Sequence, residues 1–139
     1  VKLNKMPLGA VLMNPFVDYT EPVGSMKEYQ HHDLIVNNSV YEEGIPYLAI
    51  KLGCDENRRN SSPVYGNFDG LPPMCIVISE HECCYDQNVL LVNRAREAGV
   101  ECTFCVWKYM CHVFAILSPF IPEGKMAQDY MCEWIKSRF

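Results

Sequence analysis

The sequence lacks three features that would each point to a whole class of protein. It has no uninterrupted apolar run approaching the roughly 20 residues that a membrane-spanning helix requires, so no membrane span is predicted. It also has no block of like charge, because 12 basic and 17 acidic side chains, with a net charge of −5, are mixed along the chain. This distribution predicts neither nucleic-acid binding nor attachment through a polybasic surface. What is present, with 49% hydrophobic residues, is enough to build the packed core of one domain.

No secretory leader is predicted either, since residues 1–5 read VKLNK and no long apolar segment follows them. Eight cysteines are present, and most lie inside apolar segments, as Cys75 and Cys102 do. A free thiol in such a segment behaves as a small hydrophobic group. We therefore expect reduced, buried thiols in a cytoplasmic protein.

Cys102 and Cys105 have the spacing of a metal-binding or redox motif. They fall within a predicted strand, where residues three apart face opposite sides of the sheet and cannot share one tetrahedral ion. Redox-active pairs of the thioredoxin type open a helix instead. The sequence therefore predicts neither a metal site nor a cofactor.

The first clear structural element is the apolar run of residues 9–13, which is ended by the turn pair Asn14-Pro15. A short continuous apolar run with such a stop is typical of a strand buried on both faces. A strand of this kind needs a neighbour on either side, and only two further good strand candidates follow. Part of its sheet is therefore expected to lie outside this sequence.

The segment 18–62 has no regular apolar period and is expected to be an irregular, partly helical connection. Residues 39–42 have the spacing of a capping box, which predicts a helix over residues 40–52 that a glycine and a proline break into two pieces. The polar residues 55–62 are expected to form an exposed loop.

The second half of the chain alternates between strands and helices. Residues 74–78 are a continuous apolar strand, residues 86–98 have the composition of a helix that stops at Gly99, and residues 100–106 are again a strand. This alternation implies a right-handed crossover and a parallel sheet, which is the α/β class. Apolar residues recur at helical spacing after residue 122, which predicts a terminal amphipathic helix against the sheet.

Two loops follow the predicted parallel strands, over residues 79–86 and 107–114. Catalytic groups gather beyond the carboxyl ends of such strands, so a carboxylate from the first loop could reach His112 in the second. An acid that accepts the Nδ1 proton fixes the histidine tautomer and stabilises the imidazolium formed when Nε2 takes a proton. A histidine near a strand end is more often structural, however, and this rule alone leaves that alternative open. His81, which also lies in the first loop, is expected to be an ordinary loop residue rather than a second base.

Five segments, in order along nearly the whole chain, resemble landmarks of the hormone-sensitive lipase family of α/β-hydrolase esterases. They are PLGAVLMNPFVD at residues 7–18, SPVYG at 62–66, GLPP at 70–73, AREAGV at 95–100 and MCHVF at 110–114. The resemblance implies that residues 1–139 are one partial domain, the C-terminal part of an α/β-hydrolase fold, with parallel strands, flanking helices and an incomplete sheet.

The resemblance also implies roles for single residues. His112 would be the general base, and Glu82 the acid, because it stands where the family places an Asp or Glu shortly after the strand. Glu80 and Asp86 remain alternatives, since a slip of two residues in the alignment would change the assignment. The substrate would be a small-molecule ester.

The sequence departs from this family in the residues that should precede the acid and the histidine. The triad of the fold runs serine, acid, histidine, with the serine in a GxSxG turn and oxyanion donors in an earlier glycine-rich loop. No two glycines are consecutive in this chain, and no serine has a glycine two residues away on both sides. The serines are Ser25, Ser39, Ser61, Ser62, Ser79, Ser118 and Ser137.

Two functions therefore stay open. In the first, the chain is the C-terminal portion of a serine carboxylic-ester hydrolase, supplies the acid and the histidine, and is nearly inactive alone because it lacks the groups that dominate acyl transfer. In the second, it is a complete product that serves as a non-catalytic binding or interaction module derived from an α/β-hydrolase. The strand at residues 9–13 would offer an uncovered edge, either to the missing N-terminal half or to another partner.

Overall fold

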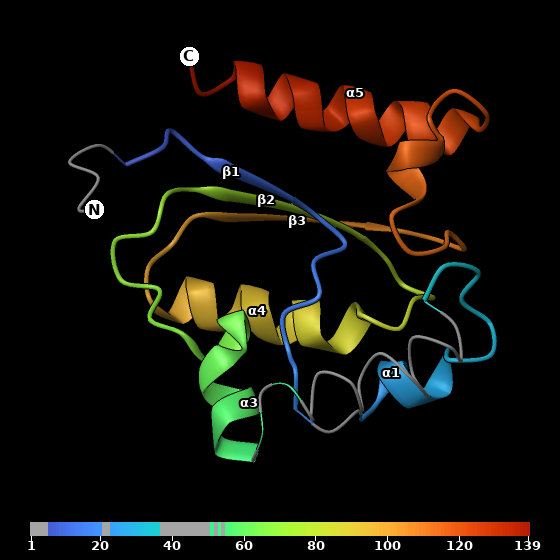
Figure 1. Ribbon diagram of the computed structural model, residues 1–139. Coiled ribbons are helices and arrows are strands. Elements are labelled where there is room, and N and C mark those ends of the chain that lie inside the picture. Colours follow the sequence, from blue (N-terminus) through green and yellow to red (C-terminus); the bar gives the residue numbers. More distant parts are fainter. Residues whose placement is uncertain (1–5, 21–22, 37–50, 52, 54) are drawn as a thin grey trace.

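The computed structural model describes residues 6–20, 23–36, 51, 53 and 55–139, and its centre is a three-stranded parallel sheet (Figure 1). The strands are β1 (Ala10–Met13), β2 (Met74–Ser79) and β3 (Cys102–Trp107), in the order β1-β2-β3. Each predicted strand is present, although β3 begins and ends slightly later than expected. The predicted α/β class with a parallel sheet is confirmed.

The central strand β2 makes two cores because successive side chains of a strand point to opposite faces. All six of its residues are buried. Ile76 and Ile78 face the core formed with helix α4 (Tyr85–Glu97), whereas Cys75 and Val77 face the core formed with helix α5 (Pro122–Lys136). A sheet covered on both faces explains why β2 is a continuous apolar run.

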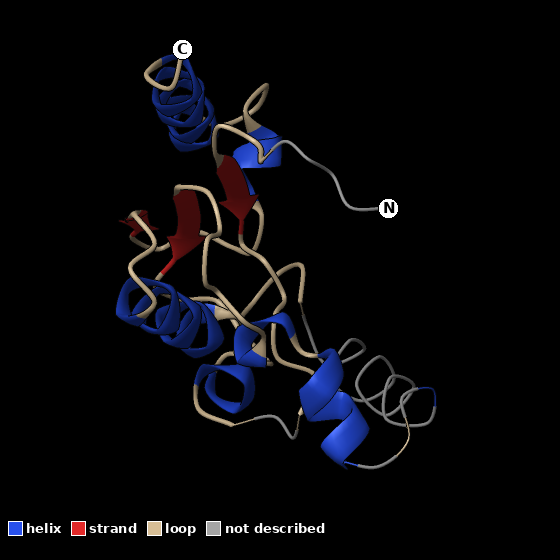
Figure 2. Ribbon diagram, turned by 90° about the vertical axis from the view of Figure 1, so that its left-hand side faces the viewer, coloured by secondary structure: helices blue, strands red, loops and turns tan. Residues whose placement is uncertain are grey.

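The helices lie in layers above and below the sheet, as Figure 2 shows. On one side are α4, which is the crossover between β2 and β3, and the short helices α1 (Ser25–Glu28), α3 (Asp55–Ser61) and η2 (Pro63–Tyr65). On the other are α5 and the 3-10 helix η3 (Phe114–Leu117). The predicted crossover and terminal helix are therefore both found.

Three predictions about the first half need correction or fall outside the described residues. Residues 55–62 are not a loop, because α3 occupies most of them; its first turn is acidic and its last turn basic, which suits the helix dipole. Strand β1 is not buried on both faces but half-buried throughout, since in the described part of the chain it pairs only with β2. The helix predicted over 40–52 lies outside the described residues except for Lys51.

The two cysteines of β3 lie on opposite faces of the sheet, as predicted from their spacing. Cys102 packs against the core between the sheet and α4, and Cys105 packs against the core between the sheet and α5. The two thiols therefore cannot bind one metal ion.

Candidate active site

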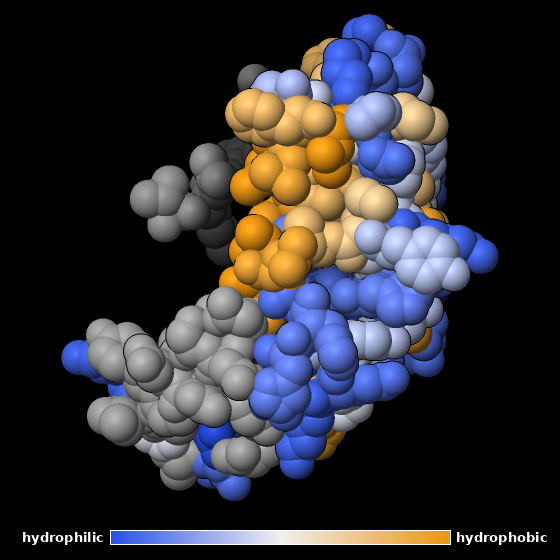
Figure 3. Space-filling model, turned by 90° about the vertical axis from the view of Figure 1, so that its right-hand side faces the viewer, coloured by the Kyte–Doolittle hydropathy of each residue, from blue (hydrophilic) through white to orange (hydrophobic). Residues whose placement is uncertain are grey.

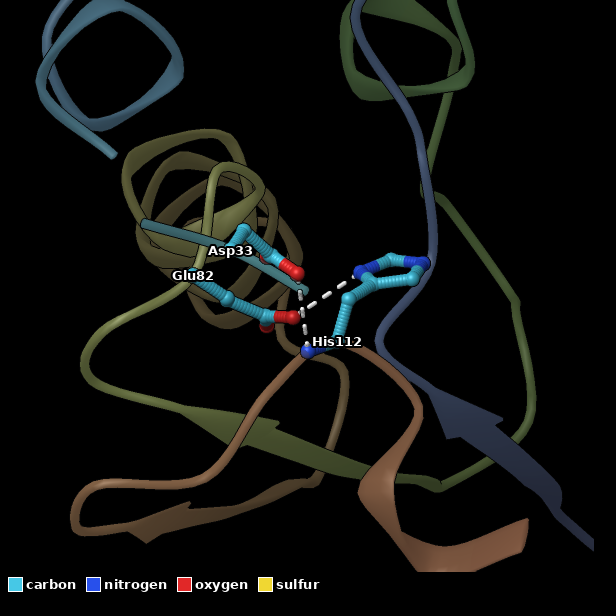
Figure 4. Close-up of side chains that lie close together, drawn as sticks. All are labelled: Asp33, Glu82 and His112. Carbon is cyan, nitrogen blue, oxygen red and sulfur yellow. Dashed lines mark hydrogen bonds and ion pairs between the residues drawn. The ribbon is translucent and has the colours of Figure 1, made fainter. Parts of the chain in front are cut away.

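The carboxyl ends of β2 and β3 adjoin, so the loops that follow them meet. The two strands pair in parallel as far as Ser79 opposite Trp107. The loop after β2 carries Glu82 and the loop after β3 carries His112. Figure 4 shows both side chains converging there, together with a third, Asp33.

Glu82 is fully buried and receives three N–H groups. Its Oε2 accepts a hydrogen bond from Asn14 Nδ2 at 2.6 Å and lies 2.9 Å from Nδ1 of His112. Its Oε1 accepts the backbone N–H of Ser79 at 3.4 Å. A buried carboxylate is stable only when donors replace its lost hydration, and these three serve that purpose.

The imidazole of His112 has one nitrogen engaged and one available. Because a carboxylate faces Nδ1, that nitrogen carries the proton and Nε2 is left as an acceptor. Nε2 has no hydrogen-bond partner among the described residues and, in Figure 4, points away from both carboxylates. The side chain as a whole is 13% exposed.

Ser79 joins the two loops at their base. Its buried Oγ accepts the backbone N–H of His81 and that of Met110, each at 3.2 Å. One hydroxyl thus fixes the start of the acid loop against the histidine loop.

The backbone on both sides of His112 is in a conformation that side chains disfavour. Tyr109 has φ 56° and Val113 has φ 49°, both in the left-handed region. For a β-branched residue such as valine this is a rare and costly backbone conformation, of the kind found where surrounding structure holds a functional turn in place.

Asn14 is a site residue that the sequence did not reveal. It ends β1 with φ 46°, is 2% exposed, and donates to Glu82. In the sequence the Asn-Pro pair predicts only a turn. Asparagine tolerates the left-handed region and offers a side-chain donor there, which is the one local signal of its role.

Asp33 is the second residue that the sequence did not reveal. It is 3% exposed, and its Oδ1 accepts the backbone N–H of Ile35 at 3.0 Å, of Val36 at 3.1 Å and of His112 at 3.4 Å. Its Oδ2 accepts the N–H of Cys83 at 3.3 Å. No sequence pattern indicates these long-range contacts.

The two other candidate acids lie apart from His112. Glu80 lies beside His81, with 3.3 Å between Oε1 and Nδ1. Asp86 accepts the backbone N–H of Ser25 at 2.8 Å, and its own N–H donates to Ser25 Oγ at 3.0 Å. Of the three acids considered, only Glu82 has a carboxylate hydrogen-bonded to His112.

His81 also lies outside the cluster. Its ring is stacked on Tyr109, with centroids 5.0 Å apart, and is tilted against Tyr29 at 5.6 Å. The side chain is 42% exposed. These contacts are those of a loop residue at the rim.

Asp33, Glu82 and His112 bring their ligand atoms within 4.8 Å of one another, which is close enough for a metal ion. Each carboxylate oxygen, however, already accepts at least one N–H group. Donor hydrogens around these oxygens oppose a cation, because hard cations require oxygens with free lone pairs. The donor set therefore suits a hydrogen-bonded acid and histidine better than a metal site.

Thiol nucleophiles are disfavoured next to this cluster. Burial raises the pKa of Cys83 to about 12, with the charges of Asp33 and Glu82 adding to the effect. Burial also raises the pKa of Cys84 and of Cys111. Only a thiolate attacks efficiently, so these groups are poor nucleophiles at neutral pH.

A family model described as the alpha/beta hydrolase fold matches residues 2–116. The chain belongs to the α/β-hydrolase family. No helix among the described residues of this α/β-hydrolase is long and apolar enough to cross a bilayer.

Curated relatives of this α/β-hydrolase include enzymes that act on esters or acetyl groups by name. An "Esterase" of Acinetobacter venetianus is 29% identical over 133 residues, which are 95% of this chain and 43% of the relative. An "Acetyl-hydrolase" of Streptomyces hygroscopicus is 29% identical over 123 residues, which are 88% of this chain and 40% of the relative. The chain therefore spans less than half the length of these relatives.

Solved structures show the same likeness. A hormone-sensitive lipase from a metagenome library superposes with a TM-score of 0.84 at 29% identity, over 96% of this chain and 44% of that one. A homologue of hormone-sensitive lipase, also from a metagenome library, gives 0.84 at 30% identity, over 96% and 45%. The predicted resemblance to the hormone-sensitive lipase group of α/β-hydrolases is confirmed.

Proposed function

We propose that this chain is the C-terminal portion of a serine carboxylic-ester hydrolase, in which Glu82 orients His112 as the general base. One observation carries the proposal: a fully buried carboxylate oxygen lies 2.9 Å from Nδ1 of a histidine whose other nitrogen is unengaged among the described residues. The ester as substrate class is supported by the names of the two curated relatives.

The chemistry follows from this pair. Nε2 of His112 removes the proton of an attacking serine hydroxyl while the hydroxyl oxygen bonds to the ester carbonyl carbon. Glu82, already bound to the Nδ1 proton, stabilises the imidazolium that results. The imidazolium then gives its proton to the departing alcohol, and the same pair activates water to hydrolyse the acyl-enzyme.

The serine and the oxyanion donors belong, in this proposal, to a polypeptide segment outside these 139 residues. The absence of GxSxG and of paired glycines supports it, as does the coverage of 40–45% of the relatives' lengths. Residues 1–139 would then be one partial domain, and the chain alone would be nearly inactive because preorganised oxyanion donors supply a large part of such catalysis.

The outer side of β1 has the surface expected of a covered edge. A groove of about 310 Å³ runs between β1 and the end of α5. It is lined by Leu8, Gly9, Val11, Trp134, Ile135, Arg138 and Phe139. We propose that the missing N-terminal half covers this groove and extends the sheet at β1.

More apolar surface lies on the face where the strands end. Figure 3 views that face and shows hydrophobic side chains gathered between α5 at the top and the hydrophilic surface below. Ile116 of η3 is 53% exposed and Phe120, which follows η3, is 83% exposed. Apolar surface of this kind suits an acyl chain or an ester alcohol as well as a covering segment.

The test compares two polypeptides, the 139-residue chain alone and the longer product of its own reading frame. We expect hydrolysis of a short p-nitrophenyl ester only by the longer product. His112→Ala should lower its kcat by about 10⁴-fold or more, because the base is lost, and the matched variant His81→Ala should stay within a few-fold of wild type.

Two outcomes would contradict the proposal. Ester cleavage by the 139-residue chain, abolished by His112→Ala, would show that a nucleophile is present within it. A reading frame that begins at Val1 and encodes no nucleophile would favour the alternative, a non-catalytic interaction module that uses the groove along β1.

A further inference from the structure

Asp33 connects three segments that are distant in sequence. It stands in the segment that follows α1, and its carboxylate binds N–H groups of that segment, of the Glu82 loop at Cys83 and of the His112 loop at His112 itself. The contact with His112 spans 79 positions of the chain, and that with Cys83 spans 50.

We propose that Asp33 is a positioning residue of the catalytic machinery, which holds the acid loop and the histidine loop in register. This inference rests on the proposed function. Asp33 does not act on the substrate in this scheme; it acts through the backbones of Cys83 and His112. Its burial, at 3% exposure, keeps these charge-assisted hydrogen bonds out of competition with water.

The charge of Asp33 has a second consequence for catalysis. The ligand atoms of Asp33, Glu82 and His112 lie within 4.8 Å of one another, so two carboxylates lie on the Nδ1 side of one imidazole. When Nε2 takes the serine proton, the imidazolium interacts favourably with both negative charges, whereas the neutral imidazole does not. Such an interaction is stronger in the transition state than in the ground state, and it therefore raises kcat rather than lowering KM.

A purely architectural role would look different in experiment. If Asp33 only held its own segment through Ile35 and Val36, its loss would lower stability without changing the hydrogen bond between Glu82 and His112. The chain offers a matched control in Asp18, whose carboxylate also makes a long-range contact, because it accepts a hydrogen bond from the Tyr65 hydroxyl away from the cluster.

The first test observes the Nδ1 proton of His112 by NMR and does not require an active enzyme. In ¹⁵N-histidine-labelled protein the Nδ1 proton of His112 should give a far-downfield NMR resonance, assigned by its loss in Glu82→Gln. We expect Asp33→Asn to broaden or shift this resonance and Asp18→Asn to leave it in place. A folded Asp33→Asn protein with the wild-type resonance would overturn the inference.

The second test is kinetic and uses the longer, active polypeptide. Asp33→Asn should lower kcat by about 10- to 100-fold, the range typical of partners that orient a functional histidine, with KM within about two-fold of wild type. Asp18→Asn should change both constants by less than about three-fold. An unchanged kcat in Asp33→Asn would overturn the inference, whereas an inactive wild type would contradict the proposed function and leave the NMR test decisive for Asp33.

If Asp33→Asn fails to fold, the wild-type protein supplies the measurement. The amides of Cys83 and His112 lie outside helices and strands, yet Asp33 accepts both of them. We expect hydrogen exchange at both amides to be at least about 100-fold slower than in an unstructured peptide. Unprotected amides at these two positions would overturn the inference.

Discussion

The carboxyl-terminal edge of the sheet and the outer side of β1 are built in opposite ways. At the first, groups from four segments hydrogen-bond to two buried carboxylates, those of Glu82 and Asp33. At the second, the groove between β1 and α5 is mainly apolar, and Phe139 at its rim is 93% exposed. The polar region is organised by hydrogen bonds within this chain, whereas the proposed function assigns a covering segment to the apolar one.

In the proposed function, this difference separates the part of the active site that is organised in advance from the part that is added by another segment. The acid and the histidine are already fixed by hydrogen bonds to Asn14, Ser79 and Asp33. The nucleophile, in the proposed function, arrives with the segment that covers the apolar edge. Assembly would then bring a serine to a preformed acid–histidine pair, which is an efficient route because the pair needs no reorganisation.

The largest expected effect is on kcat and follows from replacing the acid of the polar region. In the longer, active polypeptide, Glu82→Gln should lower kcat by about 10⁴-fold, because an amide cannot hold the required tautomer or stabilise the imidazolium. Glu80→Gln is the matched control and should leave kcat within a few-fold, since Glu80 lies beside His81 instead. A large loss in Glu80→Gln with an active Glu82→Gln would reverse the assignment of the acid.

A smaller effect is expected at Asn14, measured as the free energy of unfolding in urea. Asn14→Gly removes the donor to the buried Glu82 carboxylate but keeps the left-handed backbone accessible, and we expect a loss of about 1.5–3 kcal/mol. Asn14→Ala should lose about 1 kcal/mol more, because alanine disfavours that backbone conformation. Equal stability of Asn14→Gly and wild type would show that the polar network does not depend on this residue.

The apolar edge should give a further, smaller effect on association. We expect the 139-residue chain alone to self-associate through the groove, and Ile135→Lys, at a position 43% exposed, to weaken this by about 1 kcal/mol. Phe120→Ser is the control, since Phe120 is 83% exposed but does not line the groove. Sedimentation velocity measures the difference, and identical behaviour of both variants would mean that the groove is not the contact surface.

The smallest expected effect is on the reactivity of the thiols, which should differ between buried and exposed cysteines. Burial raises the pKa of Cys75 to about 11 and that of Cys83 to about 12 from a reference of 9.0, whereas Cys132 is exposed. At pH 8 a thiol reagent should label Cys132 rapidly and the two buried thiols only on unfolding. Rapid labelling of Cys83 in the folded protein would contradict its burial.

The same raised pKa values give stability a pH dependence of defined sign. The neutral thiol is favoured in the folded state, so the contribution of Cys75 and Cys83 is fully present below pH 9. It is lost as the pH rises through 11 and 12, where the buried thiols must ionise. Replacing Cys83 by alanine should reduce this alkaline loss in a urea titration at high pH.

The sequence predicted those features that depend on local pattern. The apolar run of β2 and the helical composition before Gly99 were enough to predict the crossover. The loop rule brought a carboxylate of the first loop and His112 to one edge, and the family resemblance selected Glu82 among the three acids. Residues 55–62 were interpreted wrongly because α3 is a polar surface helix without an apolar stripe, and periodicity is the signal on which such predictions depend.

Asn14 and Asp33 could not have been found in the same way. Each acts through hydrogen bonds to groups far along the chain, 68 positions away for Asn14 and Glu82 and 79 for Asp33 and His112. Such contacts are set by how three loops meet in space, and neither residue differs locally from an ordinary turn residue. Long-range polar satisfaction is the part of this site that only coordinates reveal.

The left-handed backbone at Val113 should make the turn around His112 less stable to heat than the sheet. At φ 49° the backbone of this valine is strained, and the contacts around it maintain the strain. The backbone will return to a more favourable conformation when those contacts weaken. We therefore expect heating to separate the imidazole from Glu82 before the three strands separate.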